Sequence, residues 1–90
     1  MNHYYVYIIY SSVGDCYYRG FSENPVNRLL QHNNAESRFT SKYNDWKLVY
    51  VEQFVNKREA LIREKGLKKY SKTQIRDLIP LPRNIVTRFG

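Results

Sequence analysis

The most informative side chain in the sequence is Glu64, an acid inside a strongly basic segment. On a helical period it shares its side with Ala60, Leu61 and Leu67, so its carboxylate is expected to point toward the core side of a helix. A buried carboxylate must be paired, protonated or bound to a cation. Two partners fit the pattern: Lys68, four residues along the helix, or a hard divalent ion such as Mg²⁺, which often takes only one or two protein carboxylates.

Two of the nine tyrosines, Tyr7 and Tyr18, are candidates for handling a water or a proton. Core packing is the ordinary role of any one tyrosine, but a phenol near a cation can also position or deprotonate a water. Gly20 favours the second role, because a glycine inside a strand often marks the close approach of a ligand or another backbone.

Arg28 and His32 lie four residues apart and therefore on the same side of a predicted helix. An arginine presents a planar, permanently charged fork that matches phosphate oxygens. A histidine can hydrogen-bond phosphate or transfer a proton near neutral pH. The alternative is that both residues simply belong to a solvated helix face.

The charge balance indicates a polyanionic partner. Fifteen Lys and Arg against eight Asp and Glu give a net charge of +7, and clustered cations bind a phosphate backbone by releasing its counterions. The cations crowd one stretch: Lys57, Arg58, Arg63, Lys65, Lys68, Lys69, Lys72 and Arg76. A plain solubility surface is the alternative.

The elements that must position these side chains can be predicted along the chain. Residues 4–11 and 16–21 form strands joined by a turn, and if Ser11 opposes Cys16 then Tyr7, Tyr18 and Gly20 project from the same face. A helix over 25–33, capped by Asn24, presents an apolar stripe. That stripe consists of Val26, Leu29, Leu30 and Asn33.

The second half of the chain is predicted to contain one strand and two helices. A loop over 34–45 leads into a strand over 47–54. Helices over 57–70 and 72–79 follow, with Asn56 and Ser71 as caps. We expect one domain over residues 1–79 and a C-terminal tail over 80–90.

The sequence contains no apolar run near the roughly 20 residues that a membrane span needs. Its one cysteine, Cys16, cannot form an internal disulfide, which fits a reducing compartment. We therefore expect a cytoplasmic protein that does not contact a membrane.

The chain resembles the GIY-YIG nuclease superfamily. Tyr5-Val6-Tyr7 stands where that family has Gly-Ile-Tyr, and Tyr18-Arg19-Gly20 stands where it has Tyr-Ile-Gly. Further along, residues 27–33 resemble the family's arginine-bearing helix, 39–50 its loop and third strand, and 60–65 its metal-binding segment. The chain looks most like small stand-alone members related to the amino-terminal nuclease domain of the UvrC repair protein.

The resemblance implies an α/β (α+β) fold, with a three-stranded antiparallel sheet flanked by helices. It also implies a metal-dependent endonuclease that hydrolyses DNA phosphodiester bonds, in repair or processing. Glu64 would hold one Mg²⁺ (or Mn²⁺), and Arg28 would stabilise the phosphate charge. Tyr7, Tyr18 or His32 would orient or deprotonate the water, and which of the three is the base stays open.

Residues around the second motif and on the basic helix are the expected substrate contacts. These are Arg19, Gly20, Lys65, Lys68 and Lys69. The chain departs from the family at Arg19, which replaces an isoleucine, and at Phe21, where some relatives have lysine. Two alternatives therefore stay open: a nucleic-acid-binding module that keeps the fold without cutting, and a domain whose basic helix binds an acidic protein partner.

Overall fold

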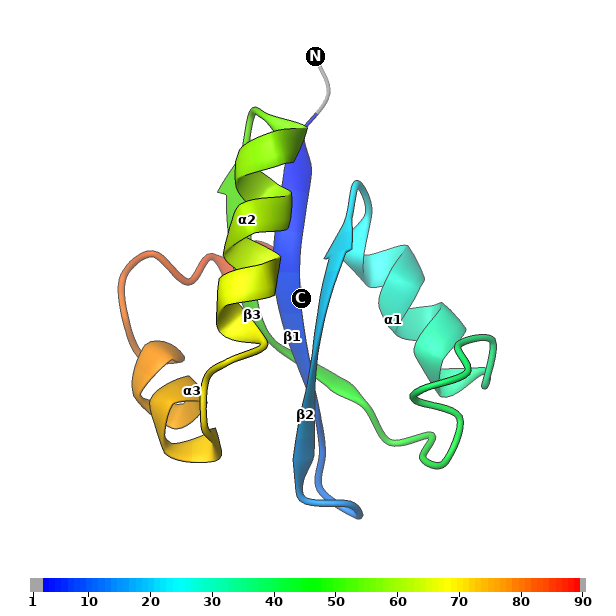
Figure 1. Cartoon of the computed structure of the whole chain (residues 1–90). Helices are drawn as coiled ribbons and strands as arrows, with labels where there is room; N and C mark the ends of the chain where they lie inside the picture. Colours follow the sequence, from blue (N-terminus) through cyan, green and yellow to red (C-terminus); the bar gives the residue numbers. More distant parts are fainter. Residues whose placement is uncertain (1–2, 90) are drawn as a thin grey trace.

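A computed structural model describes residues 3–89 of the chain as a three-stranded antiparallel sheet with three α-helices and one short 3-10 helix (Figure 1). The strands are β1 (Tyr4–Ser11), β2 (Cys16–Ser22) and β3 (Lys47–Phe54), in the order β2-β1-β3. The helices are α1 (Pro25–Asn33), α2 (Lys57–Leu67), α3 (Lys72–Leu78) and η1 (Val86–Phe89). The predicted α+β class and its antiparallel sheet are confirmed. None of the described helices is long and apolar enough to cross a membrane.

The strand register is the one predicted from the turn. Ser11 opposes Cys16, and Tyr7 opposes Gly20. Strand β1 lies in the middle of the sheet, so its side chains are buried alternately on two faces. This explains why residues 4–11 form a nearly continuous apolar and aromatic run.

Each face of the sheet has its own core. On one face, Val6, Ile8 and Tyr50 pack with residues of α2 and α3. On the other face, Tyr7, Ile9, Val51 and Trp46 pack with side chains from α1 and η1. Tyr18, on β2, packs against this second core. Tyr7 and Tyr18 therefore project from the same face, as predicted.

Helix α1 has the predicted limits, but the face it buries differs from the prediction. Asn24 caps the helix through its side chain and Pro25 is the first residue. Val26 and Leu30 are exposed, whereas Pro25 and His32 are buried. The predicted apolar stripe is therefore wrong for Val26 and Leu30 and confirmed for Leu29, which packs against the core. His32 finds hydrogen-bond partners in the interior and orients the helix around them.

The last two helices are shorter than predicted. Helix α2 ends at Leu67 rather than residue 70, and Gly66 lies in its last turn. Helix α3 ends at Leu78 rather than residue 79. The two caps are confirmed: Asn56 accepts hydrogen bonds from backbone amides of α2, and Ser71 forms a reciprocal capping box on α3.

The loop between α1 and β3 is fastened at both of its ends. The Asn33 side chain both accepts from the backbone N–H of Trp46, at 2.8 Å, and donates to its carbonyl, at 3.0 Å. Asp45 accepts from the Ser11 hydroxyl at 2.7 Å and from the Val13 amide at 3.0 Å. These bonds lower the pKa of Asp45 to about 2. The loop is thus held against the β1–β2 turn.

The segment after Pro80 does not extend away from the domain as the predicted tail would. The Asn84 side chain accepts from the Val51 amide at 3.0 Å and donates to the carbonyls of Val49 and Ile79. The Phe89 ring meets Tyr5 edge-on at 5.3 Å. Pro80 and Pro82 make residues 81–89 look like a free tail, but the Asn84 side chain and the backbone bond from the Ile85 amide to the Val51 carbonyl, at 2.9 Å, hold them against the open edge of β3.

We expect Asn84→Ala to lower the free energy of unfolding by about 1–3 kcal/mol, because it removes the partners of partly buried backbone groups on β3. Urea denaturation measures the change. Asn44→Ala, at an exposed loop position, is the matched control and should leave stability nearly unchanged. Equal stability of the two variants would contradict the role given to Asn84.

Candidate active site

A buried chain of hydrogen bonds joins three separate elements. The Tyr7 hydroxyl, from β1, lies 2.9 Å from Nε2 of His32 on α1. Nδ1 of His32 lies 2.6 Å from the Thr40 hydroxyl in the following loop. All three side chains are buried. A solvated helix face, the alternative considered for His32, is therefore wrong, and both ring nitrogens are occupied.

Tyr18 and Gly20 of β2 complete the surroundings of this chain. The Tyr18 ring lies 5.0 Å from the His32 ring, tilted by 58°. Gly20 lies directly against the Tyr7 ring: a Cβ on residue 20 would be 2.7 Å from Cε1 of Tyr7 and closer still to its hydroxyl. Only a glycine at this position lets Tyr7 reach His32.

Burial keeps this hydrogen-bonded chain uncharged at neutral pH. It raises the pKa of Tyr7 to about 12, and the nearby Arg28 opposes that shift only in part. It also lowers the pKa of His32 to about 4, and the positive charge of Arg28 adds to that effect. A neutral imidazole has one N–H, so one of its nitrogens donates and the other accepts.

Arg28 and Glu64 bring opposite charges to the same region. Arg28 is half-buried on α1 and donates a hydrogen bond to Gln31. The Glu64 side chain is only 18% exposed, and its charge contributes to the raised pKa of Tyr7. Helix α2 covers the sheet beside β1 (Figure 1). The structure therefore places Tyr7, Tyr18, Arg28 and His32 together. Glu64 lies on α2, whose buried residues pack on the other face of the sheet, and its charge still acts on Tyr7. The catalytic roles of all five residues stay predictions.

The predicted alternative for Glu64, an ion pair with Lys68, is present but weak. Their charged atoms are 3.8 Å apart, too far for a hydrogen bond, and the lysine is exposed. Among residues 3–89, no group of three or more His, Cys, Asp or Glu side chains gathers. A single carboxylate with water and phosphate oxygens nevertheless suits Mg²⁺, so Glu64 fits as the protein ligand of such an ion.

Arg19 does not occupy the place expected of a substrate contact. It opposes Ile8, on the face that α2 and α3 cover, and its guanidinium donates to the Tyr70 carbonyl at 2.8 Å. Burial also lowers its pKa. Residues of a strand alternate between faces, so Arg19 points away from its neighbours Tyr18 and Gly20. A contact of Arg19 with substrate stays a prediction.

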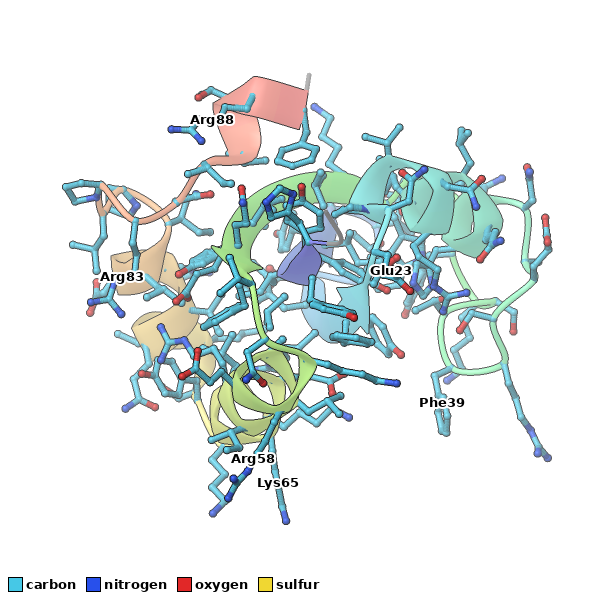
Figure 2. The ribbon with its side chains drawn as sticks, turned by 90° about the horizontal axis from the view of Figure 1, so that it is seen from above. Glu23, Phe39, Arg58, Lys65, Arg83 and Arg88 are labelled. Atoms are coloured by element: carbon cyan, nitrogen blue, oxygen red, sulfur yellow. The ribbon has the colours of Figure 1, made fainter. Side chains whose placement is uncertain are left out.

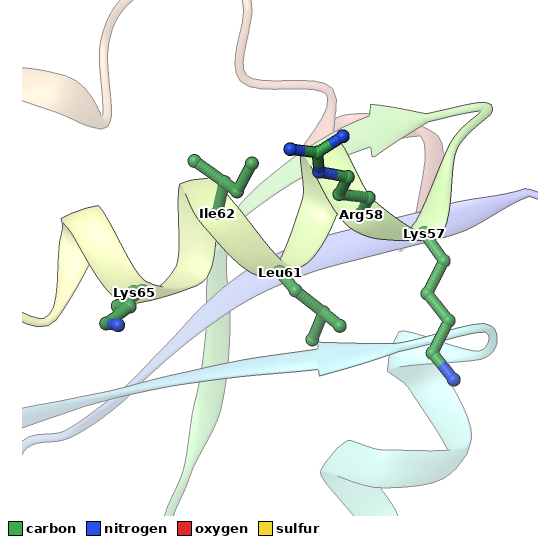
Figure 3. A pocket seen from close by; sticks show the side chains of 5 residues that line it. All are labelled: Lys57, Arg58, Leu61, Ile62 and Lys65. Carbon is green, nitrogen blue, oxygen red and sulfur yellow. The ribbon is translucent and has the colours of Figure 1, made fainter.

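The lysines predicted to contact substrate lie on α2 or directly after its end at Leu67. Lys65, Lys68 and Lys69 are all exposed. Lys65 and Arg58 extend away from the body of the molecule (Figure 2). They border a shallow groove of about 500 Å³ on the same helix, which is floored by Leu61 and Ile62 (Figure 3).

Thr40 is the site residue for which the sequence gives no role. It lies in a polar loop with no periodicity, so nothing indicates that its hydroxyl is buried. Its carbonyl also accepts from the indole N–H of Trp46 at 3.0 Å. His32 and Thr40 are eight residues apart, and no regular element links them, so their spacing does not predict a contact.

We expect Gly20→Ala to displace the Tyr7 ring and to destabilise the fold by about 1–3 kcal/mol, as overpacking of a core does. Gly66→Ala is the matched control, because a Cβ there meets no atom within 4 Å. It should instead stabilise α2 by about 0.5–1 kcal/mol. Chemical denaturation of both variants tests the pair, and equal effects would refute the close packing of Tyr7 on Gly20.

We expect the protein to lose stability as the pH falls from about 6.5 toward 4. Unfolded chains take up a proton on histidine near pH 6.5, whereas folded His32 stays neutral down to about pH 4. Protonation therefore favours the unfolded state throughout that window. Urea denaturation between pH 7.5 and 5.5 measures the slope above the range of most carboxylates, and His32→Gln should reduce it. An NMR titration of His32 with a midpoint near 6.5 would overturn this expectation.

Comparison with known proteins agrees with this geometry. The model of the GIY-YIG catalytic domain matches residues 3–76. A UPF0213 protein of Clostridium perfringens is 40% identical over 76 residues, covering 83% of this chain and 81% of that protein. A UPF0213 protein of Staphylococcus saprophyticus is 34% identical over 80 residues, covering 88% and 96%.

A solved structure shows the same fold. The solution NMR structure of a UPF0213 protein from Bacillus halodurans superimposes with a TM-score of 0.58 at 22% identity, covering 98% of this chain and 94% of that one. The family match spans the sheet, α1 and α2, and so includes every element that contributes to the site. The chain belongs to the GIY-YIG family, whose catalytic domain has a nuclease-type fold.

Proposed function

We propose that this protein is a metal-dependent endonuclease that hydrolyses DNA phosphodiester bonds, acting in the cytoplasm in repair or processing of DNA. One observation carries the proposal. Tyr7 and Tyr18 lie beside His32, which is hydrogen-bonded to Tyr7 and Thr40, and the charges of Arg28 and Glu64 both act on Tyr7. This donor set suits a phosphate with a hard cation.

Arg28 and Glu64 have complementary roles in this proposal. Glu64 holds one Mg²⁺ or Mn²⁺, which when bound withdraws charge from the phosphate and favours attack by water. Arg28 donates to the phosphate oxygens on which charge develops in the transition state. Its contact with Gln31 holds the guanidinium near Tyr7 before substrate binds.

The phenols orient the attacking water. Tyr7 is buried and stays protonated at neutral pH, so it contributes a fixed dipole and not a base. Tyr18 is only partly buried, so a water can reach its hydroxyl. The water attacks phosphorus opposite the leaving oxygen and releases its proton to solvent. The bond from phosphorus to the leaving oxygen breaks, and that oxygen takes up a proton from solvent. His32 positions Tyr7 and does not contact the substrate.

The exposed lysines of α2 provide affinity without sequence preference. Lys65 on α2, and Lys68 and Lys69 just after its end, are exposed near the helix that carries Glu64, so they can contact phosphates on either side of the scissile bond. Contacts of this kind position a duplex or a strand but do not read its bases. Binding should therefore weaken with salt, with a log–log slope near −0.9 for each phosphate of duplex DNA neutralised.

We expect Glu64→Gln to lower the rate of Mg²⁺-dependent cleavage by at least about 100-fold while DNA affinity persists, because the amide keeps the shape but cannot hold the cation. Glu59→Gln is the matched control: it removes a carboxylate from the exposed side of α2 and should leave the rate unchanged. A panel of nucleic acids incubated with metal and each variant provides the measurement.

Two results would overturn the proposal. If the protein binds nucleic acid without metal and cuts no member of the panel, it is a binding module with the GIY-YIG fold. If Glu64→Gln and Glu59→Gln cut equally fast, Glu64 is not the residue on which cleavage depends.

A further inference from the structure

Phe39 is held out into solvent beside the candidate active site. Its side chain is 82% exposed, more than any other large hydrophobic residue among those the structure describes as exposed. It lies in the loop between α1 and β3, immediately before Thr40, which contacts His32. A single exposed apolar residue is ordinary in a protein surface. Phe39 differs from such residues in the ordered turn that carries it and in the cations around it.

The loop under Phe39 is fixed on both sides of the ring. Thr40 is hydrogen-bonded to His32 through its hydroxyl at 2.6 Å and to the Trp46 indole through its carbonyl at 3.0 Å. The Thr40 amide donates to the Ser37 carbonyl at 3.3 Å, and the Ser41 hydroxyl donates to the Arg38 carbonyl at 3.2 Å. The Phe39 ring therefore projects from an ordered turn, and the next residue of that turn, Thr40, contacts His32 of the candidate site.

The surroundings of Phe39 are cationic. Arg38 and Lys42, on the same turn, are both exposed. Phe39 projects toward the same side of the molecule as Arg58 and Lys65 of α2 (Figure 2). An aromatic ring between exposed cations is the arrangement by which proteins hold single strands, because the cations contact phosphates while the ring stacks on a base.

We propose that Phe39 stacks on an unpaired base of the bound DNA, so that the substrate presents a single-stranded or locally unpaired stretch next to the scissile phosphate. The face of a base inside a duplex is covered by its neighbours, and only an unpaired base is free to accept the ring. The inference deepens the proposed function, since it names the substrate class of the same site. It requires DNA binding at this face but not cleavage.

The test measures binding without metal, on matched single-stranded, gapped and fully paired oligonucleotides. Phe39→Ala should weaken binding to the first two by roughly 5- to 150-fold, the range of one base–aromatic stack, and leave the paired duplex unaffected. Phe39→Leu should behave like Phe39→Ala, because it keeps an apolar side chain without a π-face. Phe39→Trp should bind at least as well as the unchanged protein. Val55→Ala, at another exposed apolar residue, is the control.

A fluorescent adenine analogue placed opposite the gap reports stacking directly. Its emission should be quenched by the unchanged protein and by Phe39→Trp, but not by Phe39→Leu. Quenching without cleavage on addition of Mg²⁺ would support the inference and overturn the nuclease proposal. Cleavage of paired DNA at equal rates by the unchanged protein and Phe39→Ala, without quenching, would overturn the inference alone. An absence of DNA binding would overturn both.

Discussion

The hydrogen bonds between Tyr7, His32 and Thr40 are the interaction on which the arrangement of the site depends. Each of these polar side chains is buried, and an unsatisfied buried polar group costs about 1–3 kcal/mol. The three partners come from β1, α1 and the following loop, so satisfying one fixes the position of the others. Gly20 belongs to the same constraint, because a side chain there would occupy the space of the Tyr7 ring.

The hydrogen-bonded side chains of Tyr7, His32 and Thr40 fix the geometry of the site without carrying charge. Burial moves the pKa of Tyr7 upward and that of His32 downward, so both stay neutral near pH 7. The charges of Arg28 on α1 and Glu64 on α2 both act on Tyr7. A neutral, fully bonded support does not change protonation when a phosphate or a cation arrives, so it holds the charged groups at fixed positions during binding.

Elsewhere in this small domain, hydrogen bonds of polar side chains hold separate segments together. Asp45 ties the loop to the hairpin turn, Arg19 ties β2 to the connection after α2, and Asn84 ties the last residues to β3. A chain of 90 residues buries too little apolar surface to position every loop by packing alone. Each of these three side chains satisfies backbone or hydroxyl groups that would otherwise lack a partner, and each holds a segment next to the sheet.

The sequence by itself determined the strands, the register of the hairpin and the caps of all three α-helices. It also singled out Tyr7, Tyr18, Arg28 and His32, which lie together in the fold. These features depend on local chemistry: alternation along a strand, turn residues, and capping side chains next to a helical period. The inward direction of Glu64 follows from the same period, since Ala60 and Leu67 are buried beside it.

Only the tertiary structure decided the buried face of α1, the role of Thr40, the face of Arg19 and the packing of residues 81–89. The deciding partners are distant in the chain for three of these side chains: Tyr7 for His32, Tyr70 for Arg19, and Val49 and Val51 for Asn84. Thr40 is closer to His32, but it lies in a loop without periodicity. A polar side chain in a single sequence looks equally suited to solvent and to the interior. The difference is set by whether the folded chain offers it a hydrogen-bond partner, and that depends on contacts that local pattern does not encode.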